Sequence, residues 1–280
     1  MTSATTTRRA GIIGWPVEHS KSPVVHSYWL DHYSVEGSYV RLPVRPKELA
    51  DALNSLAQRG FVGINITLPH KERALEFVDE VSPEAQRIGA ANTIFVNERG
   101  RLLATNTDAY GFLANLRAEA PEFDVAEAPA VVVGAGGASR AVCVALQDAG
   151  VPEIYLVNRT ESRAESIAES LGGNVKVISW NERSSHLHNA GLLVNTTSLG
   201  MTGQPKLEMD IGRLSGSGVV ADIVYSPLET PLLAAAHANG LRTVDGLGML
   251  LYQAQAGFEG WFGKKPAVTP SLRQHILSAS

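Results

Sequence analysis

The chain has 280 residues, of which 44% are hydrophobic and 19% are charged, a composition typical of a folded globular protein that excludes disorder, collagen and coiled coil. Its 24 Lys and Arg against 28 Asp and Glu give a formal net charge of -4, so no excess of positive charge is present to neutralise a nucleic-acid backbone, and we expect no nucleic-acid partner. At roughly 100 to 200 residues per domain, this length predicts two domains.

The first ten residues, MTSATTTRRA, are not followed by the apolar region and small-residue cleavage site of a signal peptide, and we expect them to form a loose tail. No later stretch approaches the ~20 consecutive apolar residues that cross a bilayer, so we expect no membrane partner. The single cysteine, Cys143, excludes an internal disulfide and is expected to be buried. A reducing cytoplasm is the expected compartment.

Short runs rich in Val and Ile alternate with amphipathic stretches of helical length along nearly the whole chain, which predicts an α/β fold with mainly parallel sheets. In the first part we expect a helix that begins at Ser22 and Pro23, where the serine hydroxyl can cap and the proline takes the first turn. A second helix is expected to begin similarly near Pro69. The strands expected in this part are residues 10–14, 38–44, 61–66, 93–97 and 102–106.

A polar, proline-bounded segment, PEFDVAEAP at residues 121–129, follows a helix expected over residues 109–120 and predicts the domain boundary. Beyond it the alternation restarts, and a last long helix is expected over residues 249–262. The strands expected here are residues 130–133, 153–157, 175–179, 192–195 and 219–223. The predicted domains are a substrate-binding domain at 1–120 and a Rossmann-type dinucleotide-binding domain at 121–246, with residues 247–280 packing back on the first.

The second domain opens with a strand, a glycine-rich turn and a helix in the order that a dinucleotide-binding fold requires. The turn reads Gly134-Ala135-Gly136-Gly137-Ala138, and Ser139 follows where the G-x-G-x-x-G pattern has its third glycine. Glycine at 134 allows a tight turn, and glycine at 136 lets the backbone approach a pyrophosphate at the helix N-terminus. The pattern favours a nucleotide site, and a glycine-rich connector in another α/β fold is the alternative.

The end of the next expected strand, Asn158-Arg159-Thr160, indicates which nucleotide is bound. An NAD enzyme usually has an acidic residue there, which binds the ribose hydroxyls. Arg159, with Arg163 in the first turn of the next helix, can bind a 2'-phosphate instead, and Thr160 can cap that helix. We therefore predict NADP rather than NAD. The alternative is that both arginines are solvated surface charges.

Polar residues gather at the strand ends and turns of the first domain. They are Ser20, Ser22, the run from Asn65 to Lys71, Ala91-Asn92-Thr93 and Asn106-Thr107-Asp108. Because ligands of open α/β sheets bind outside the carboxyl ends of the strands, this set predicts a pocket for a small, hydroxyl-rich anion. Each residue also has a structural interpretation, such as a helix cap for Ser22 or a surface ion pair between Lys71 and Asp108.

Taken together, these segments resemble the shikimate dehydrogenase family, NADPH-dependent enzymes of aromatic amino acid biosynthesis. The similarity spans nearly the whole chain, and so many ordered segments are far more specific than any single motif. Trp15 and Ser139 are departures from the commonest residues that leave the chemistry unaffected. The matching segments are 14–16, 19–23, 65–71, 89–93, 106–108, 111, 134–140, 158–160, 163, 195–200, 222–227, 230–232, 245–250 and 253–254.

The resemblance implies a role for each matching residue. Ser20 and Ser22 would bind the substrate carboxylate, and Lys71 and Asp108 would be the catalytic pair. The residues that would hold ring hydroxyls or lie near the substrate are Asn65, Thr67, Asn92, Asp108, Gln253 and Tyr225. The residues that would bind the cofactor are Gly134, Ala135, Gly136, Gly137, Ala138, Asn158, Arg159, Thr160, Arg163, Thr197, Ile223 and Gly246. The family architecture also places the C-terminal helix on the substrate domain, which would bring Gln253 to the pocket.

Reducing a ring ketone with NADPH delivers a hydride to carbon while negative charge develops on oxygen, so the site needs a proton donor or cation aimed at that oxygen. Lys71 is the candidate, and Asp108 would orient it; which of the two gives up the proton stays open. His70, beside Lys71, is expected to be structural. His186 and His188 lack carboxylate or cysteine companions, so we expect no metal.

Reversible reduction of 3-dehydroshikimate to shikimate is the leading hypothesis. A catabolic quinate/shikimate dehydrogenase, usually NAD-dependent, is the alternative enzyme, although the acidic residue that it would need at the Asn158-Arg159-Thr160 turn is absent. A non-catalytic NADP-binding sensor on the same fold is the alternative of another class, and the presence of both Lys71 and Asp108 argues against it. An enzyme for an amino analogue of shikimate would share almost every residue. A monomer and a homodimer are both left open.

Overall fold

The computed structural model describes residues 7–279 and divides into two compact units. The first unit comprises the described residues up to Thr107 and from Gln253 on, and the second runs from Asp108 to Tyr252. The division lies upstream of the boundary expected at residues 121–129. The helix that we expected to end the first domain instead packs against the first helix of the Rossmann sheet, so it belongs to the second unit.

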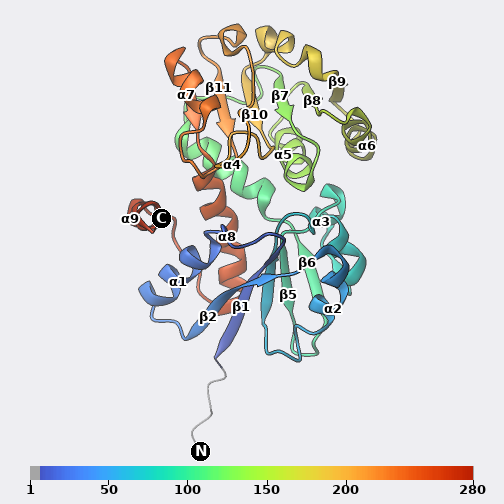
Figure 1. Ribbon diagram of the computed structural model, residues 1–280, viewed down its shortest axis with the longest axis vertical. Helices are drawn as coiled ribbons and strands as arrows, with labels where there is room; N and C mark the ends of the chain where they lie inside the picture. Colours follow the sequence, from blue (N-terminus) through green and yellow to red (C-terminus); the bar gives the residue numbers. More distant parts are fainter. Residues whose placement is uncertain (1–6, 280) are drawn as a thin grey trace, which may run out of the picture. The chain divides into compact units, whose positions relative to one another are not determined.

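The first unit contains a six-stranded sheet in the order β2-β1-β3-β5-β6-β4 (Figure 1). Its strands are β1 (Arg8–Gly14), β2 (Gly37–Pro43), β3 (Gly63–Ile66), β4 (Glu80–Val81), β5 (Thr93–Val96) and β6 (Leu102–Thr105). All neighbouring strands are parallel except that β5 runs antiparallel to both β3 and β6. Part of the expected N-terminal tail lies outside the described residues. Arg8 and Arg9, which we placed in that tail, belong to β1.

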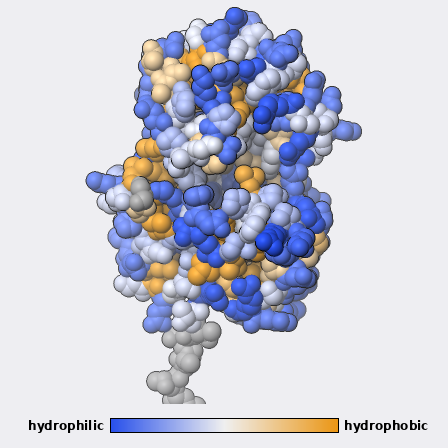
Figure 2. All heavy atoms as spheres, viewed as in Figure 1, coloured by the Kyte–Doolittle hydropathy of each residue, from blue (hydrophilic) through white to orange (hydrophobic). Residues whose placement is uncertain are grey.

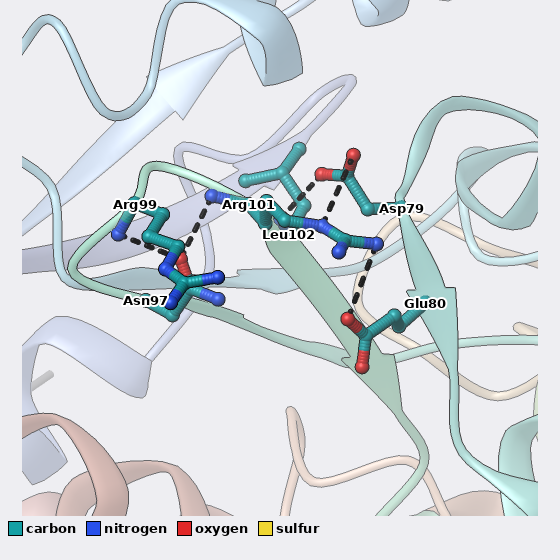
Figure 3. A network of polar contacts seen from close by, with 6 residues as sticks. All are labelled: Asp79, Glu80, Asn97, Arg99, Arg101 and Leu102. Carbon is teal, nitrogen blue, oxygen red and sulfur yellow. Dashed lines mark hydrogen bonds and ion pairs between the residues drawn. The ribbon is translucent and has the colours of Figure 1, made fainter.

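The edge strand β4 was not predicted, and a network of polar contacts holds it beside β6 (Figure 3). The Arg101 guanidinium lies 3.7 Å from the Asp79 carboxylate and 3.2 Å from that of Glu80. Asp79 also accepts a hydrogen bond from the backbone amide of Leu102 at 2.7 Å, and Asn97 closes the β5–β6 turn by accepting one from the amide of Arg101 at 3.0 Å. These groups are partly exposed, so the network fixes one margin of the sheet.

The helices of the first unit partly match the expected ones. They are α1 (Ser22–His32), the 3-10 helices η1 (Pro46–Glu48) and η2 (Arg73–Phe77), α2 (Leu49–Asn54), α3 (Pro83–Ile88) and α9 (Pro270–Ser278). Ser22 is the first residue of α1 and not its cap, because Lys21 takes the cap position without a side-chain hydrogen bond. The helix expected near Pro69 is absent: the His70 amide closes a turn onto the Thr67 carbonyl, and only η2 follows.

The second unit is built on a fully parallel sheet in the order β12-β11-β10-β7-β8-β9 (Figure 1). Its strands are β7 (Ala130–Val133), β8 (Ile154–Val157), β9 (Val175–Ile178), β10 (Leu192–Asn195), β11 (Val219–Asp222) and β12 (Arg242–Val244). Numbered within the unit, this is the 3-2-1-4-5-6 order of a dinucleotide-binding fold. β7, β10 and β11 are buried along their whole length, as strands covered on both faces must be.

Helices connect the strands of the second unit, and one helix is shared with the first. They are α4 (Asp108–Glu119), α5 (Gly137–Asp148), α6 (Glu161–Leu171), η3 (Trp180–Glu182), η4 (Ser185–Asn189), η5 (Ile211–Arg213), α7 (Pro231–Ala238) and α8 (Gly246–Phe262). The division between the units falls within α8, so residues 246–252 belong to the second unit and residues 253–262 to the first.

Hydrophilic residues cover much of the face shown in Figure 2, with hydrophobic patches between them. Among residues 7–279, no helix is long and apolar enough to cross a membrane. Buried apolar residues cluster around Ile64 and Ile94 in the first unit and around Val131 and Leu193 in the second.

His26 of α1 is buried in the first unit without a hydrogen bond. Its ring is 0% exposed and stacks on Tyr39 with centroids 4.0 Å apart and planes 3° from parallel. The ring centroids of Trp29 and Trp261 lie 5.7 and 5.6 Å from that of His26. Neither ring nitrogen of His26 has a hydrogen-bond partner among the described residues. Burial lowers the pKa of His26 from 6.5 to about 3. The imidazole is therefore neutral in the folded chain at any physiological pH.

We expect the free energy of unfolding to fall as the pH drops from 6.5 towards 3, because the unfolded chain protonates His26 in that range and the folded chain does not. Between pH 8 and pH 5 this difference amounts to about 2 kcal/mol. His26→Phe keeps a stacking ring and removes the titration, so its stability should change by about 2 kcal/mol less than that of the wild type between the two pH values. Urea unfolding followed by tryptophan fluorescence measures the free energy of unfolding of the wild type and of the variant at each pH.

A constant change in stability from the larger phenyl ring cancels in this comparison between two pH values. His188→Gln, at an exposed histidine, is the matched control and should keep the wild-type pH dependence. The same pH dependence in His26→Phe as in the wild type would show that His26 does not titrate on unfolding.

Candidate active site

The two expected carboxylate-binding serines lie in the turn between β1 and α1. The hydroxyl of Ser20 accepts a hydrogen bond from the Ser22 amide at 3.3 Å, so the two residues are adjacent in space. The Arg41 guanidinium of β2 donates twice to the Ser20 carbonyl, at 2.7 and 3.2 Å. A Cβ at Gly14, where β1 ends, would lie 2.5 Å from the Thr67 side chain. This glycine therefore lets the turn after β3 come close to the turn after β1.

Asn65, in β3, is almost fully hydrogen-bonded within the first unit. Its amide nitrogen donates to the Asn92 carbonyl at 3.0 Å and to the Thr93 hydroxyl at 3.1 Å. Its oxygen accepts from the Tyr39 hydroxyl at 2.6 Å, and that hydroxyl also bonds with the Ser22 side chain. Both N–H groups of Asn65 are thus used, and its oxygen keeps one lone pair for a further donor.

Tyr39 is a hydrogen-bond partner of the expected site residue Asn65 that sequence reasoning missed. Burial raises its pKa well above the ordinary tyrosine value, partly offset by the hydrogen bond with Ser22, so the hydroxyl stays protonated. It lies in the middle of β2, away from any strand end, and the available signal was only a tyrosine at a buried position of a strand. The link from Tyr39 to Asn65 depends on strand pairing that a local sequence pattern does not encode.

Asn92 and Gln253 are brought together from positions 161 residues apart. The Asn92 amide nitrogen donates to the Gln253 side-chain oxygen at 3.1 Å and to the Thr107 hydroxyl at 2.9 Å. The Asn92 side-chain oxygen accepts from the Thr107 amide at 2.9 Å, and the Thr107 hydroxyl also donates to the Gln253 backbone carbonyl at 2.9 Å. The network is buried, and it places three neutral polar side chains at one edge of the first sheet.

The expected catalytic pair falls on two units. Lys71 and Thr67 are half-buried in the segment after β3, where the Lys71 carbonyl accepts a hydrogen bond from the Ala91 amide at 2.8 Å. Asp108 is buried at the first position of α4, in the second unit. The roles expected of Lys71 and Asp108 remain predictions.

His70 makes a structural contact, as expected. Its side chain is buried, and Nε2 lies 2.7 Å from the Val44 carbonyl. Burial lowers the pKa of His70, and the charge of Arg73 lowers it further, while the hydrogen bond to Val44 opposes both. The ring therefore links the segment after β3, to which His70 belongs, to the segment after β2, to which Val44 belongs. Within residues 7–279, no three His, Cys, Asp or Glu side chains are grouped so that they could hold a metal ion.

The glycine turn of the second unit follows β7 and leads into α5. Gly134 has φ of +123°, and a Cβ there would lie 2.5 Å from the Thr196 hydroxyl, so only glycine fits. A Cβ at Gly136 would meet nothing within 4 Å, which means that this backbone faces open space. The turn continues with Ala135, Gly137 and Ala138, and α5 begins at Gly137. Open space at the Gly136 Cα, just before a helix N-terminus, fits the close approach of a dinucleotide pyrophosphate.

Ser139 has a hydrogen-bonding role at the position where the pattern has a third glycine. Its hydroxyl accepts from the Gly136 amide at 3.2 Å and lies 2.6 Å from the Thr196 hydroxyl, which donates to the Val133 carbonyl at 2.7 Å. The side chain thus ties the glycine turn to the segment after β10. Cys143, further along α5, is fully buried as expected, and burial raises the pKa of its thiol to about 12.

The residues expected to read the 2'-phosphate lie where β8 ends. The Asn158 side chain donates to the Thr160 carbonyl at 2.8 Å, which closes the turn. Thr160 takes the N-cap position of α6, but its hydroxyl makes no capping hydrogen bond, in contrast to our expectation. Arg159 and Arg163 are exposed, and neither forms an ion pair with another described residue. Two free guanidiniums beside the glycine turn suit a phosphate group.

The remaining cofactor candidates meet at the ends of β10 and β11. The amide and hydroxyl of Thr197 donate to the Asn195 side-chain oxygen at 3.0 and 2.7 Å, and the Ile223 amide donates to the Asn195 carbonyl at 3.0 Å. A Cβ at Gly246 would collide with the Ile223 carbonyl, so glycine is required for this close approach. Tyr225 is half-buried two residues beyond Ile223.

The second unit therefore carries the sheet order and the glycine turn of a dinucleotide-binding domain. The first unit carries a hydrogen-bonding edge suited to a small polyhydroxy ligand. Together they define a nicotinamide-dependent oxidoreductase.

Comparison with known proteins identifies the family. Residues 12–94 match the shikimate dehydrogenase substrate binding domain, residues 116–203 match the shikimate / quinate 5-dehydrogenase model, and residues 246–270 match the shikimate 5'-dehydrogenase C-terminal domain. The chain belongs to the shikimate dehydrogenase family.

Similar proteins match almost end to end. The shikimate dehydrogenase (NADP(+)) of Paramagnetospirillum magneticum is 52% identical over 97% of this chain and 98% of that protein. The shikimate 5-dehydrogenase of Thermus thermophilus, solved with NADP(H) and shikimate, has a TM-score of 0.85 and 39% identity over 98% of this chain and 100% of that one. The quinate dehydrogenase of Corynebacterium glutamicum, solved with NAD, has a TM-score of 0.89 and 31% identity over 97% of this chain and 99% of that one.

Proposed function

We propose that this chain catalyses the reversible, NADP(H)-dependent interconversion of 3-dehydroshikimate and shikimate. The observation that carries the proposal is the buried amide network of Asn65, Asn92 and Gln253 at the edge of the first sheet. Neutral amides recognise hydroxyls by hydrogen bonding, and the Asn65 oxygen, which accepts one hydrogen bond from Tyr39, keeps a lone pair for such a donor. The adjacent Ser20–Ser22 turn offers donors to a carboxylate. Relatives about half identical to this chain are named for NADP(+), which supports the choice of cofactor.

The roles of the individual residues follow the same proposal. Ser20 and Ser22 bind the carboxylate, while Asn65, Thr67, Asn92, Asp108 and Gln253 hold ring hydroxyls and Tyr225 lies near the ring. Gly134 to Ala138 bind the pyrophosphate, and Asn158, Arg159, Thr160 and Arg163 bind the adenosine ribose phosphate. Thr197, Ile223 and Gly246 contact the nicotinamide half of the cofactor. We further propose a monomer or a homodimer in the cytoplasm.

The nicotinamide cofactor supplies the hydride when it is bound. The protein has to orient the ring ketone and stabilise the negative charge that develops on its oxygen. Lys71 directs its ammonium group to that oxygen, and Asp108 orients Lys71 and accepts a hydrogen bond from the neighbouring hydroxyl. This pair supplies the proton when the ketone is reduced and takes it back when shikimate is oxidised. The pH and the substrate concentrations set which direction the reaction runs.

The first test follows NADPH or NADH formation by absorbance with the purified chain, in the four pairings of shikimate or quinate with NADP or NAD. We expect strong turnover only with shikimate and NADP, because the turn after β8 carries arginines and no acidic residue. Preference for quinate and NAD would favour the catabolic enzyme. Turnover in none of the pairings would favour a sensor or an enzyme for an amino analogue.

Lys71→Met is expected to lower kcat by about 10²- to 10⁴-fold while KM for shikimate changes comparatively little, because the variant loses one member of the proton-transferring pair and keeps the hydroxyl-binding amides. Steady-state kinetics in the shikimate-oxidising direction measures both constants. Lys47→Met removes an exposed lysine of the same unit and should behave as the wild type. A Lys71→Met enzyme with the wild-type kcat would remove Lys71 from the mechanism.

Arg159→Gln is expected to raise KM for NADP by about 10- to 100-fold, which corresponds to the loss of one or two charge-assisted hydrogen bonds. KM for NAD, which lacks the 2'-phosphate, should change by less than about twofold. Arg213→Gln, at an exposed arginine paired with Asp210 elsewhere in the unit, is the control. An equal effect of Arg159→Gln on both nucleotides would show that Arg159 does not contact the phosphate.

A further inference from the structure

Asp222 is a buried carboxylate at the end of β11, and this class of sheet binds its ligand outside the carboxyl ends of its strands. It is 2% exposed, and the roles proposed above do not include it. Three donors surround it: the Asn195 amide nitrogen at 3.0 Å, the Val224 backbone amide at 3.0 Å and the Thr230 hydroxyl at 2.7 Å. All three donors are neutral.

No cation balances this carboxylate, since no described Lys, Arg or His forms an ion pair with it. Burial raises the pKa of Asp222 from 3.8 to about 6, and the hydrogen bonds from Val224, Thr230 and Asn195 oppose that rise. At pH 8 the group is therefore ionised. The fold holds a negative charge that neutral hydrogen-bond donors stabilise but no cation balances, so a positive charge that arrives from outside the chain is favoured beside it.

The carboxylate is tied to the segment that we expect to line the nicotinamide. Asp222 accepts a hydrogen bond from the backbone amide of Val224, one residue beyond Ile223. The Ile223 amide donates to the backbone carbonyl of Asn195, and the Asn195 side chain donates to Asp222. Gly246 packs against the Ile223 carbonyl. Asp222 is thus hydrogen-bonded to the backbone next to Ile223, the residue that Gly246 approaches.

The nicotinamide ring of a dinucleotide cofactor carries a positive charge when oxidised and none when reduced, because the hydride brings two electrons with one proton. We propose that Asp222 sets the relative affinity for the two redox forms, its negative charge favouring the oxidised cofactor. This inference rests on the proposed function, and it makes Asp222 an electrostatic residue that acts across the Ile223 backbone. A purely structural role would affect both redox forms alike.

The test measures the Kd of NADP+ and of NADPH separately by isothermal titration calorimetry at pH 8, without substrate. In Asp222→Asn, which keeps the shape and one acceptor oxygen, the ratio of Kd for NADP+ to Kd for NADPH should rise by about 3- to 10-fold over the wild type. Thr230→Val removes one hydrogen bond to Asp222 and keeps its charge, so the ratio should stay within about twofold of the wild type. Asp210→Asn removes an exposed carboxylate of the same unit and should leave both constants unchanged.

An unchanged ratio in a folded Asp222→Asn protein that binds both nucleotides would overturn the inference and leave the proposed function standing. So would a Thr230→Val protein whose ratio shifts as far as that of Asp222→Asn. If Asp222→Asn does not fold by circular dichroism, Asp222→Ser removes the same charge and keeps an oxygen for the surrounding donors, with the same expected shift. A wild-type protein that binds neither nucleotide would instead overturn the proposed function, and the inference with it.

Discussion

The hydrogen bonds of the Asn92 side-chain amide hold together the polar network at the strand ends of the first unit. A buried amide must satisfy its donors and acceptors internally, because each unpaired group costs roughly 1 to 3 kcal/mol. Asn92 meets this demand by bonding to Thr107 and Gln253, and its backbone carbonyl accepts from Asn65. These bonds fix the end of β3, the start of β5, the exit of β6 and the second half of α8 in one arrangement. The polar edge is therefore preorganised by its own hydrogen bonds.

An asparagine plays the corresponding part in the second unit, with a different electrostatic result. Asn195 joins the end of β10 to the end of β11 and organises Thr197 through its side-chain oxygen. Its partner across the strands is the Asp222 carboxylate, where the partners of Asn92 are neutral. The Asn92 network thus consists of neutral hydrogen-bonding groups suited to hydroxyls, and the Asn195 network contains a buried charge. The difference matches the chemistry that each network is proposed to serve.

Much of the fold could be predicted from the sequence, because short runs of buried β-branched residues such as Val131 to Val133 alternate regularly with amphipathic stretches of helical length. Strands β4 and β12 were missed because two or three residues are too few to show a period. The helix expected near Pro69 was wrong, since the proline signal also fits a turn closed by His70 and Thr67. The glycine turn and the strand-end polar residues were found because motif and position agree. Tyr39 and Asp222 were not, because Tyr39 meets Asn65 from two strands away and Asp222 meets Asn195 on the neighbouring strand.

The burial of Cys143 has a practical consequence. A thiol whose pKa is raised to about 12 inside α5 has almost no thiolate at neutral pH, and thiolate is the form that reacts with maleimides. Cysteines introduced at exposed positions of either unit can therefore be labelled while the native residue stays silent. Pairs of fluorophores or spin labels, one on each unit, can therefore be attached to introduced cysteines with little background labelling of Cys143. Any effect of a ligand on the distance between the labels can then be measured without replacing the buried cysteine of α5 first.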